Sequence, residues 1–155
     1  MSRIAVFPGS FDPITTGHES IIQRALPLFD KIIIAVGENS TKKNFFNATK
    51  RYSWIKKVFA GEKKIEVRTY HGLTIDFCKS VSANYILRGL RTSADFEFER
   101  VIAQMNKAMD ENIETVFLLS TPELSAINST VVRDIIRNGG DASQFVPSAI
   151  RKEIK

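Results

Sequence analysis

The sequence has little cysteine, tryptophan or histidine, and it has no long apolar run. Its single cysteine, Cys78, excludes an internal disulfide and lies in the apolar stretch Ile75–Cys78, where buried packing is the expected role. No apolar run approaches the ~20 residues that a helix needs to cross a bilayer. We therefore expect a protein that spans no membrane, and the lone thiol is typical of a reduced, cytoplasmic setting.

An excess of acidic residues is also absent. Lysine and arginine number 22 against 17 acidic residues, which gives a net charge of +5. The basic residues are scattered and form no stripe with interleaved aromatic residues: Lys42, Lys43, Lys50, Arg51, Lys56, Lys57, Lys63, Lys64, Arg88, Arg91, Arg133 and Arg137. This pattern disfavours a nucleic-acid-binding module. A solvated basic surface around a small-anion site explains the charge better, and such a field attracts polyphosphate substrates.

The chain does contain a regular alternation of short apolar runs and longer helical patterns. The expected strands cover residues 4–7, 32–36, 65–69, 85–87 and 115–119. The expected helices cover residues 18–29, 52–60, 73–81, 94–109 and 129–137, and Pro147 opens a last one. Continuous apolar runs such as Ile32–Val36 suit a parallel sheet covered on both faces. We therefore predict one domain over residues 1–155, a doubly wound, Rossmann-like α/β sheet of five parallel strands with helices on both faces and a C-terminal helical segment from about residue 129.

In such a sheet, ligands bind beyond the carboxyl ends of the strands, where the strand order reverses. The loops that follow the strands are residues 8–16, 37–46, 70–72, 88–93 and 120–128. Lys42 lies in the second of these loops, where lysines are mostly solvated. His71 lies in the third loop and is given no role, because no metal-ligand spacing surrounds it.

The first loop joins the first strand to the first helix through the segment Pro8–His18. Its glycines let the backbone approach a ligand closely, and the free amides of a helix start attract anions. His18, in the first turn, faces the same cleft and is able to donate a hydrogen bond to a phosphate oxygen as charge develops there. The alternative is a helix N-cap with a satisfied histidine. The spacing of Gly9 and Gly17 fits neither a Walker A loop nor a dinucleotide fingerprint, which disfavours a nicotinamide-dependent dehydrogenase.

The loops after the fourth and fifth strands also carry groups suited to phosphate. Arg88 and Arg91 flank a glycine at a strand's carboxyl end, and arginine binds phosphate in a fork-like geometry. Glu99 follows in the next helix, where it is placed to meet a ribose hydroxyl or an arginine. In the fifth loop, Asn128 or Ser129 caps a helix, and the hydroxyls and free amides there predict a second phosphate cradle.

The segment Thr15–His18 resembles the [HT]-x-G-H signature of the nucleotidyltransferase superfamily. Over nearly its whole length, the chain resembles the bacterial phosphopantetheine adenylyltransferase family. The landmarks of this resemblance are Pro8–His18, Lys42–Lys43, Arg88–Arg91, Asp95–Glu99, Met105–Asn106, Ile127–Thr130, Gly140–Asp141 and Phe145–Pro147. The Arg-Gly-Leu-Arg sequence with its acidic-aromatic sequel separates this family from other nucleotidyltransferases.

The resemblance implies that ATP and 4′-phosphopantetheine give dephospho-coenzyme A and pyrophosphate, a step of coenzyme A biosynthesis. It also implies Mg²⁺ as cofactor and a homohexamer. By motif, the catalytic residues are His18, Lys42 and Arg91. The ATP-binding residues so implied are Ser10, Phe11, His18, Gly89, Leu90, Arg91, Glu99, Leu124, Ser125, Ala126, Ile127, Asn128, Ser129 and Thr130. The phosphopantetheine-binding residues are Ser10, Lys42, Thr74, Arg88, Met105 and Asn106. Ser10, Phe98, Leu124, Asn128 and Thr130 differ from the commonest family residues, and none of these differences removes an essential charge.

The predicted chemistry is in-line attack of a phosphate oxygen on the α-phosphorus of ATP, which needs positioning and electrostatics more than a covalent nucleophile. His18 and Lys42 are expected to flank the transferred group, with Arg91 on the departing phosphates. One alternative is a nucleotidyltransferase for nicotinate mononucleotide or a cytidylyl acceptor, which the Arg88–Arg91 motif disfavours. Others are an ATP-binding sensor without catalysis and a nucleic-acid-binding module, whose binding would be steeply salt-sensitive.

Overall fold

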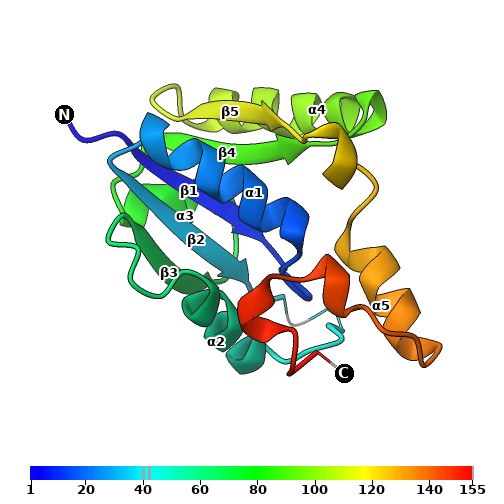
Figure 1. Ribbon diagram of the computed structural model, residues 1–155. Helices are drawn as coiled ribbons and strands as arrows, with labels where there is room; N and C mark the ends of the chain where they lie inside the picture. Colours follow the sequence, from blue (N-terminus) through cyan, green and yellow to red (C-terminus); the bar gives the residue numbers. More distant parts are fainter. Residues whose placement is uncertain (40, 42, 155) are drawn as a thin grey trace.

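The computed structural model describes residues 1–39, 41 and 43–154 (Figure 1). The strands are β1 (Ile4–Gly9), β2 (Lys31–Gly37), β3 (Ile65–Tyr70), β4 (Tyr85–Leu90) and β5 (Glu114–Leu119). The α-helices are α1 (Thr16–Ala25), α2 (Ala48–Val58), α3 (Thr74–Ser80), α4 (Ser93–Met109) and α5 (Ser129–Arg137). All paired strands are parallel, in the order β3-β2-β1-β4-β5. The predicted five-stranded parallel sheet is thus confirmed.

Helices cover both faces of this sheet, as expected. Successive side chains of a strand point to opposite faces, so Ala5 and Phe7 of β1 pack in one apolar cluster and Val6 in another. The first cluster includes Ile22 of α1, and the second includes Ile75 of α3. Figure 1 shows α1 and α3 on opposite sides of β1. Packing on both faces therefore fixes the position of β1 and of the loop that follows its carboxyl end.

Two helix boundaries among α1 to α5 differ from the prediction by more than two residues. Helix α1 ends at Ala25 and is followed by the 3-10 turn η1 (Leu26–Leu28), because Pro27 has no N–H to continue the helical hydrogen bonds. Helix α2 begins four residues before Tyr52, because the side chain of Asn47 caps it by accepting from the amide of Lys50 at 2.8 Å.

The segment after α5 forms short turns rather than the helix predicted from Pro147. These turns are η3 (Ser143–Phe145) and η4 (Ser148–Ile150). Val146, Ile150 and Ile154 are fully buried and belong to the same apolar cluster as α1 and α2. Burial of these side chains fixes the segment, so it needs no longer ladder of helical hydrogen bonds.

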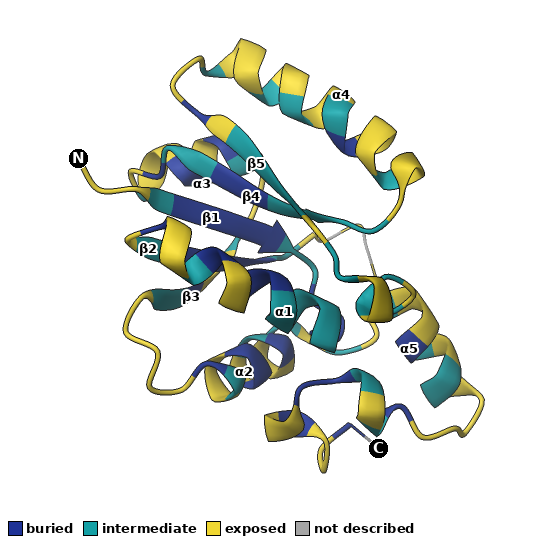
Figure 2. Cartoon of the chain, turned by 45° about the horizontal axis from the view of Figure 1, so that its top comes forward, coloured by how far each residue is buried: buried dark blue, intermediate teal, exposed yellow. Residues whose placement is uncertain are grey.

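The apolar residues of α4 are mostly exposed, although the helix itself forms where the sequence predicts it. Val101, Met105 and Met109 are 51%, 61% and 47% exposed. Figure 2 shows that α4 is largely exposed along its length. Glu99 is the buried residue of this helix. The apolar stripe of α4 therefore leaves a surface that the described part of the chain does not cover.

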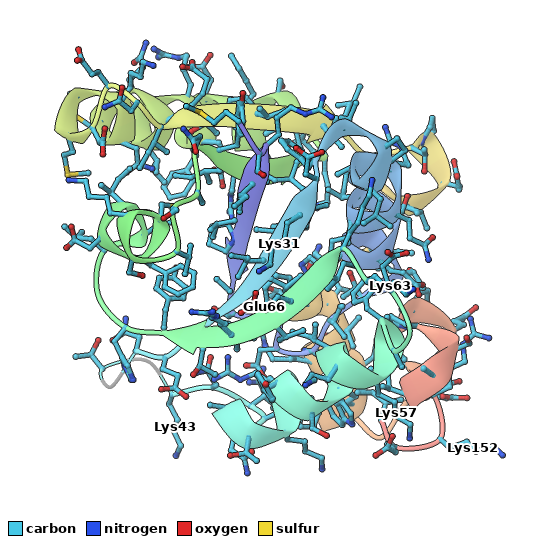
Figure 3. All side chains as sticks on the ribbon, turned by 90° about the vertical axis from the view of Figure 1, so that its left-hand side faces the viewer. Lys31, Lys43, Lys57, Lys63, Glu66 and Lys152 are labelled. Carbon is cyan, nitrogen blue, oxygen red and sulfur yellow. The ribbon has the colours of Figure 1, made fainter. Side chains whose placement is uncertain are left out.

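The basic residues form a dispersed surface charge, as the sequence predicts. Figure 3 shows Lys43, Lys57, Lys63 and Lys152 at the molecular surface. Arg51 is an exception, because its side chain is buried. Within the described ranges, no helix is both long and apolar enough to cross a membrane.

Candidate active site

The strand order reverses between β1 and β4, and two adjoining cavities open at the carboxyl ends of these strands. One cavity, of about 360 Å³, lies beside the start of α1 and is here called the α1-side cavity. The other, of about 620 Å³, lies against α4 and is called the α4-side cavity. The residues that line both are Pro8, Gly9, Ser10, Arg88, Phe98 and Glu99. The first and fourth loops therefore form the junction of two ligand-sized spaces.

The start of α1 fixes the imidazole of His18 in the α1-side cavity. Thr15 is the N-cap, and its side-chain hydroxyl accepts from the amide of His18 at 3.3 Å. The amide of Thr15 in turn donates to Nδ1 of His18 at 3.0 Å. Because a backbone amide only donates, Nδ1 is the unprotonated nitrogen and Nε2 carries the proton of the neutral ring. The helix N-cap that the sequence allowed is thus present at Thr15, and it orients the ring.

Burial and positive charge keep this histidine neutral. Desolvation, followed by the charges of Arg88 and Arg91, lowers the pKa of His18 to about 4. Its ring also packs edge-on against Phe11, with ring centroids 5.0 Å apart. Near neutral pH the site therefore presents an N–H donor that carries no positive charge of its own.

Arg88 and Glu99 form a two-pronged ion pair at the junction of the cavities. Nε of Arg88 donates to one carboxylate oxygen at 3.0 Å, and Nη2 donates to the other at 2.6 Å. Nη1 of Arg88 donates to the carbonyl of Pro8 at 2.6 Å. Of the two roles that the sequence left open for Glu99, the structure shows the contact with an arginine. The pair holds the guanidinium at the carboxyl end of β1.

Of the two cavities, Arg91 lines the one on the α1 side. Its amide donates to the carboxylate of Asp95 at 3.0 Å, and its Nη1 donates to the carbonyl of Ser125 at 3.3 Å. Gly89, between these arginines, allows close packing, since a Cβ there would lie 3.1 Å from the side chain of Ile21 of α1. The end of β4 can therefore lie directly against α1.

The start of α5 forms the opposite wall of the α1-side cavity. Asn128 caps the helix, and its Oδ1 accepts from the amide of Val131 at 2.9 Å. The hydroxyl of Ser129 donates to the carbonyl of Pro13 at 2.8 Å. Ile127 and Thr130 also line this cavity. Two helix N-termini thus face one space, which is the arrangement that favours bound phosphates.

Comparisons with known proteins agree with this geometry. The cytidylyltransferase-like family model matches residues 6–135. The phosphopantetheine adenylyltransferase of Flavobacterium psychrophilum is 54% identical over 96% of this chain and 98% of that protein. The chain belongs to the phosphopantetheine adenylyltransferase family. Another relative of the same name, from Christiangramia forsetii, is 52% identical over 96% of this chain and 98% of its own length.

Solved structures with lower identity share the fold of this phosphopantetheine adenylyltransferase family member. A Francisella tularensis bifunctional NMN adenylyltransferase/ADP ribose pyrophosphatase superposes with a TM-score of 0.71 at 19% identity. That match covers 96% of this chain and 46% of the other. A Vibrio parahaemolyticus structure assigned as a nicotinate-nucleotide adenylyltransferase has a TM-score of 0.73 at 20% identity and 99% coverage of both chains. These likenesses confirm the Rossmann-like architecture.

Most of the site residues predicted for this adenylyltransferase line one of the two cavities. The α1-side cavity brings together Ser10, Phe11, His18, Arg88, Gly89, Arg91, Glu99, Ile127, Asn128, Ser129 and Thr130. The α4-side cavity adds Thr74 and Asn106. Leu90, Leu124, Ser125, Ala126 and Met105 line neither cavity, and their binding roles stay predictions. Lys42 lies outside the described residues.

The α4-side cavity also contains Glu38, Tyr70 and His71, for which the sequence predicted no role. Nε2 of His71 lies 2.6 Å from a carboxylate oxygen of Glu38. The hydroxyl groups of Tyr70 and Thr74 lie 3.1 Å apart. All four residues line this cavity. Glu38, Tyr70 and His71 lie at the carboxyl ends of β2 and β3, and this position is the signal by which the sequence could have identified them.

Carboxylates near the cavities are already engaged. Glu99 binds Arg88, Asp95 accepts from the amide of Arg91, and Asp12 accepts from the amide of Phe45. Over the described ranges, no three His, Cys, Asp or Glu side chains are grouped so as to hold a metal ion. A cluster of protein carboxylates for Mg²⁺ is therefore not present among these residues.

Proposed function

We propose that this chain transfers the adenylyl group of ATP to 4′-phosphopantetheine, giving dephospho-coenzyme A and pyrophosphate. A phosphate oxygen of phosphopantetheine bonds to the α-phosphorus of ATP, and the bond from that phosphorus to the bridging oxygen of the β-phosphate breaks. The departing oxygen keeps the bonding electrons and leaves as pyrophosphate. Family membership at about half identity over nearly the whole chain supports this reaction.

The observation that carries the assignment is the junction of the two cavities. The α1-side cavity, lined by two helix N-termini with Arg91, suits the phosphates and ribose of ATP. The α4-side cavity, lined by Ile86, Ile102 and Ala103 with Asn106, suits an extended arm that carries amides and apolar groups. The two reacting phosphates meet where the cavities share Ser10 and Arg88. Proximity of this kind supplies much of the catalysis in phosphoryl-group transfers.

His18 donates Nε2–H to a non-bridging oxygen of the α-phosphate as negative charge accumulates there. The Thr15 amide, which donates to Nδ1, supports this tautomer. Because the ring is neutral, it needs no nearby carboxylate to balance a positive charge. Arg91 neutralises the departing pyrophosphate, and Lys42 is proposed to balance charge on the opposite side of the transferred group. Donors aimed in advance at developing charge are a principal source of catalytic rate enhancement.

Mg²⁺ is proposed to arrive with ATP as part of the substrate. This ion usually keeps several waters and binds substrate phosphates with few protein ligands. The engaged carboxylates of Asp12, Asp95 and Glu99 fit that arrangement and not a cage of protein ligands. When bound, the ion withdraws charge from the triphosphate, and the residues of this chain orient the reacting groups.

A homohexamer in the cytoplasm completes the proposal. The exposed apolar side chains of α4 and its neighbourhood support self-association, since a contiguous exposed apolar patch marks an interaction surface. Those that line neither cavity are Phe96, Val101, Met105, Met109 and Leu119. A supply of ATP and a reduced thiol at Cys78 are consistent with the cytoplasm.

The test is pyrophosphate release with ATP and 4′-phosphopantetheine together, and with each omitted in turn. The proposal predicts release with both substrates and none with either alone. Nicotinate mononucleotide and a cytidylyl acceptor serve as competing substrates, and faster turnover of either one would contradict the assignment. Binding of ATP without any release would instead identify a sensor.

A further inference from the structure

Arg51, on α2, is a buried cation that lines neither cavity. Its side chain is 2% exposed. Nη1 donates to the carbonyl of Ser10 at 2.7 Å and to that of Gly37 at 3.3 Å, and Nε donates to the carbonyl of Phe46 at 3.0 Å. One guanidinium thus joins the loop after β1, the end of β2 and the residues before α2. Burial of a charge is costly unless the group is hydrogen-bonded. These directed hydrogen bonds offset that cost, and they indicate a specific role for Arg51 at this point.

Asp12 makes the reciprocal connection from the first loop. Its carboxylate oxygens accept from the amides of Phe45 and Phe46, both at 2.8 Å. The side chain is 3% exposed. We call Asp12 and Arg51, with these hydrogen bonds, the Asp12–Arg51 clamp. The clamp holds the first loop in two ways. Arg51 binds the backbone carbonyl of Ser10, and the side chain of Asp12 binds the segment that precedes α2.

Phe11 lies between Ser10 and Asp12, which the clamp holds, and it has an unusual backbone conformation. Its φ angle is +48°, in the left-handed region that bulky residues rarely adopt. Such conformations persist only where the surroundings hold them. Arg51 holds the carbonyl just before Phe11, and Asp12 is anchored just after it. The ring of Phe11, only 2% exposed, packs edge-on against His18.

We propose that Arg51 and Asp12 are positioning residues for adenylyl transfer, which fix the left-handed turn at Phe11 and so hold the first loop and the His18 ring in place. This inference rests on the proposed function, because it concerns the same loop and the same histidine. A displacement of about 1 Å in such a site costs on the order of a hundredfold in rate. Loss of the clamp therefore reduces turnover although Arg51 lines neither cavity.

The first test compares Arg51→Lys with Arg68→Lys. Arg68 is an arginine on β3 that pairs with Glu66 and is half exposed, so its replacement controls for the substitution itself. Arg51→Lys should lower kcat for pyrophosphate release at least tenfold and raise the KM for ATP less than threefold, with the fold retained by circular dichroism. Arg68→Lys should stay within twofold of the unmodified chain. An unchanged kcat in folded Arg51→Lys would overturn the proposal.

The second test asks whether the effect passes through His18. In a His18→Ala background, Arg51→Lys should lower the remaining kcat less than threefold, because coupled residues are not additive. An equal loss in both backgrounds would show that Arg51 acts elsewhere. If Arg51→Lys does not fold, Asp12→Asn is measured by the same two criteria.

A third readout needs no substrate. The single tryptophan, Trp54, packs edge-on against Phe46, with ring centroids 4.7 Å apart. Loosening the clamp should raise acrylamide quenching of Trp54 fluorescence in Arg51→Lys and not in Arg68→Lys, and unchanged quenching would contradict the clamp. An unmodified chain that releases no pyrophosphate would overturn the proposed function. An active unmodified chain with a fully active Arg51→Lys would overturn only the positioning role.

Discussion

The backbone amide of Thr15 donates to Nδ1 of His18, three residues further along the chain, at 3.0 Å. The same bond that helps to cap α1 also sets the tautomer of the imidazole. Nε2 therefore carries the proton at the face of the α1-side cavity. The capping of α1 therefore also orients the imidazole that is proposed to act in the reaction.

The first prediction concerns stability and pH. Burial and the nearby arginines lower the pKa of His18 to about 4, below the value of about 6.5 expected in the unfolded chain. The folded state disfavours the protonated ring, so the stability from neutral His18 is fully present above about pH 6.5 and is lost as pH falls toward 4. The free energy of unfolding in urea, measured at pH 7.5 and 5.0, should fall less for His18→Gln than for the unmodified chain. Equal losses would contradict the assigned pKa.

The second prediction concerns the Arg88–Glu99 pair. Glu99→Gln removes the charge that holds Arg88 at the junction while it keeps the size of the side chain. Because Arg88 borders both cavities, kcat/KM should fall about tenfold or more for ATP and for phosphopantetheine alike, consistent with the loss of a buried, charge-assisted contact. Glu97→Gln, an exposed change on the same helix, is the matched control. An effect confined to one substrate would show that Glu99 does not act through Arg88.

The third prediction concerns the only thiol. Cys78 is fully buried, and burial raises its pKa to about 11, so little thiolate exists near neutral pH. An aromatic disulfide reagent should modify the folded chain at least a hundredfold more slowly than the chain in urea. Rapid modification of the folded chain would show that α3 opens readily from the sheet.

The fourth prediction concerns the exposed stripe of α4. Val101→Glu places a charge among the apolar side chains on this surface, and a buried unpaired charge strongly disfavours an interface. Analytical ultracentrifugation should show a smaller assembly than that of the unmodified chain. Lys56→Glu, an exposed change on α2, should leave the mass unchanged. A monomeric unmodified chain would contradict self-association through this surface.

The sheet was predictable because β1, β2, β4 and β5 each contain a short apolar run, and apolar and polar residues alternate at the start of β3. Ile32–Val36 and its neighbours required covering on both faces, and the structure covers them. The helix boundaries were less predictable, because they depend on single residues. Asn47 starts α2 early and Pro27 ends α1 early, each through one backbone hydrogen bond gained or lost.

The site was predictable where its chemistry lies in one short segment. The first loop and the arginines of the fourth loop were located from spacing and residue type, and the structure brings them together. The burial of Arg51 was not predictable, because a basic residue in a polar stretch resembles a solvated one. Its partners are backbone carbonyls from three separate segments, and only the fold reveals them.

The central claim is that adenylyl transfer proceeds at the junction of the two cavities under the control of His18. The most direct measurement is pyrophosphate release from ATP with 4′-phosphopantetheine, for the unmodified chain and for His18→Ala. Release should require both substrates, and the kcat of His18→Ala should be lower by about 10²- to 10³-fold with an unchanged circular dichroism spectrum. No release from the unmodified chain, or near-normal turnover by folded His18→Ala, would contradict it.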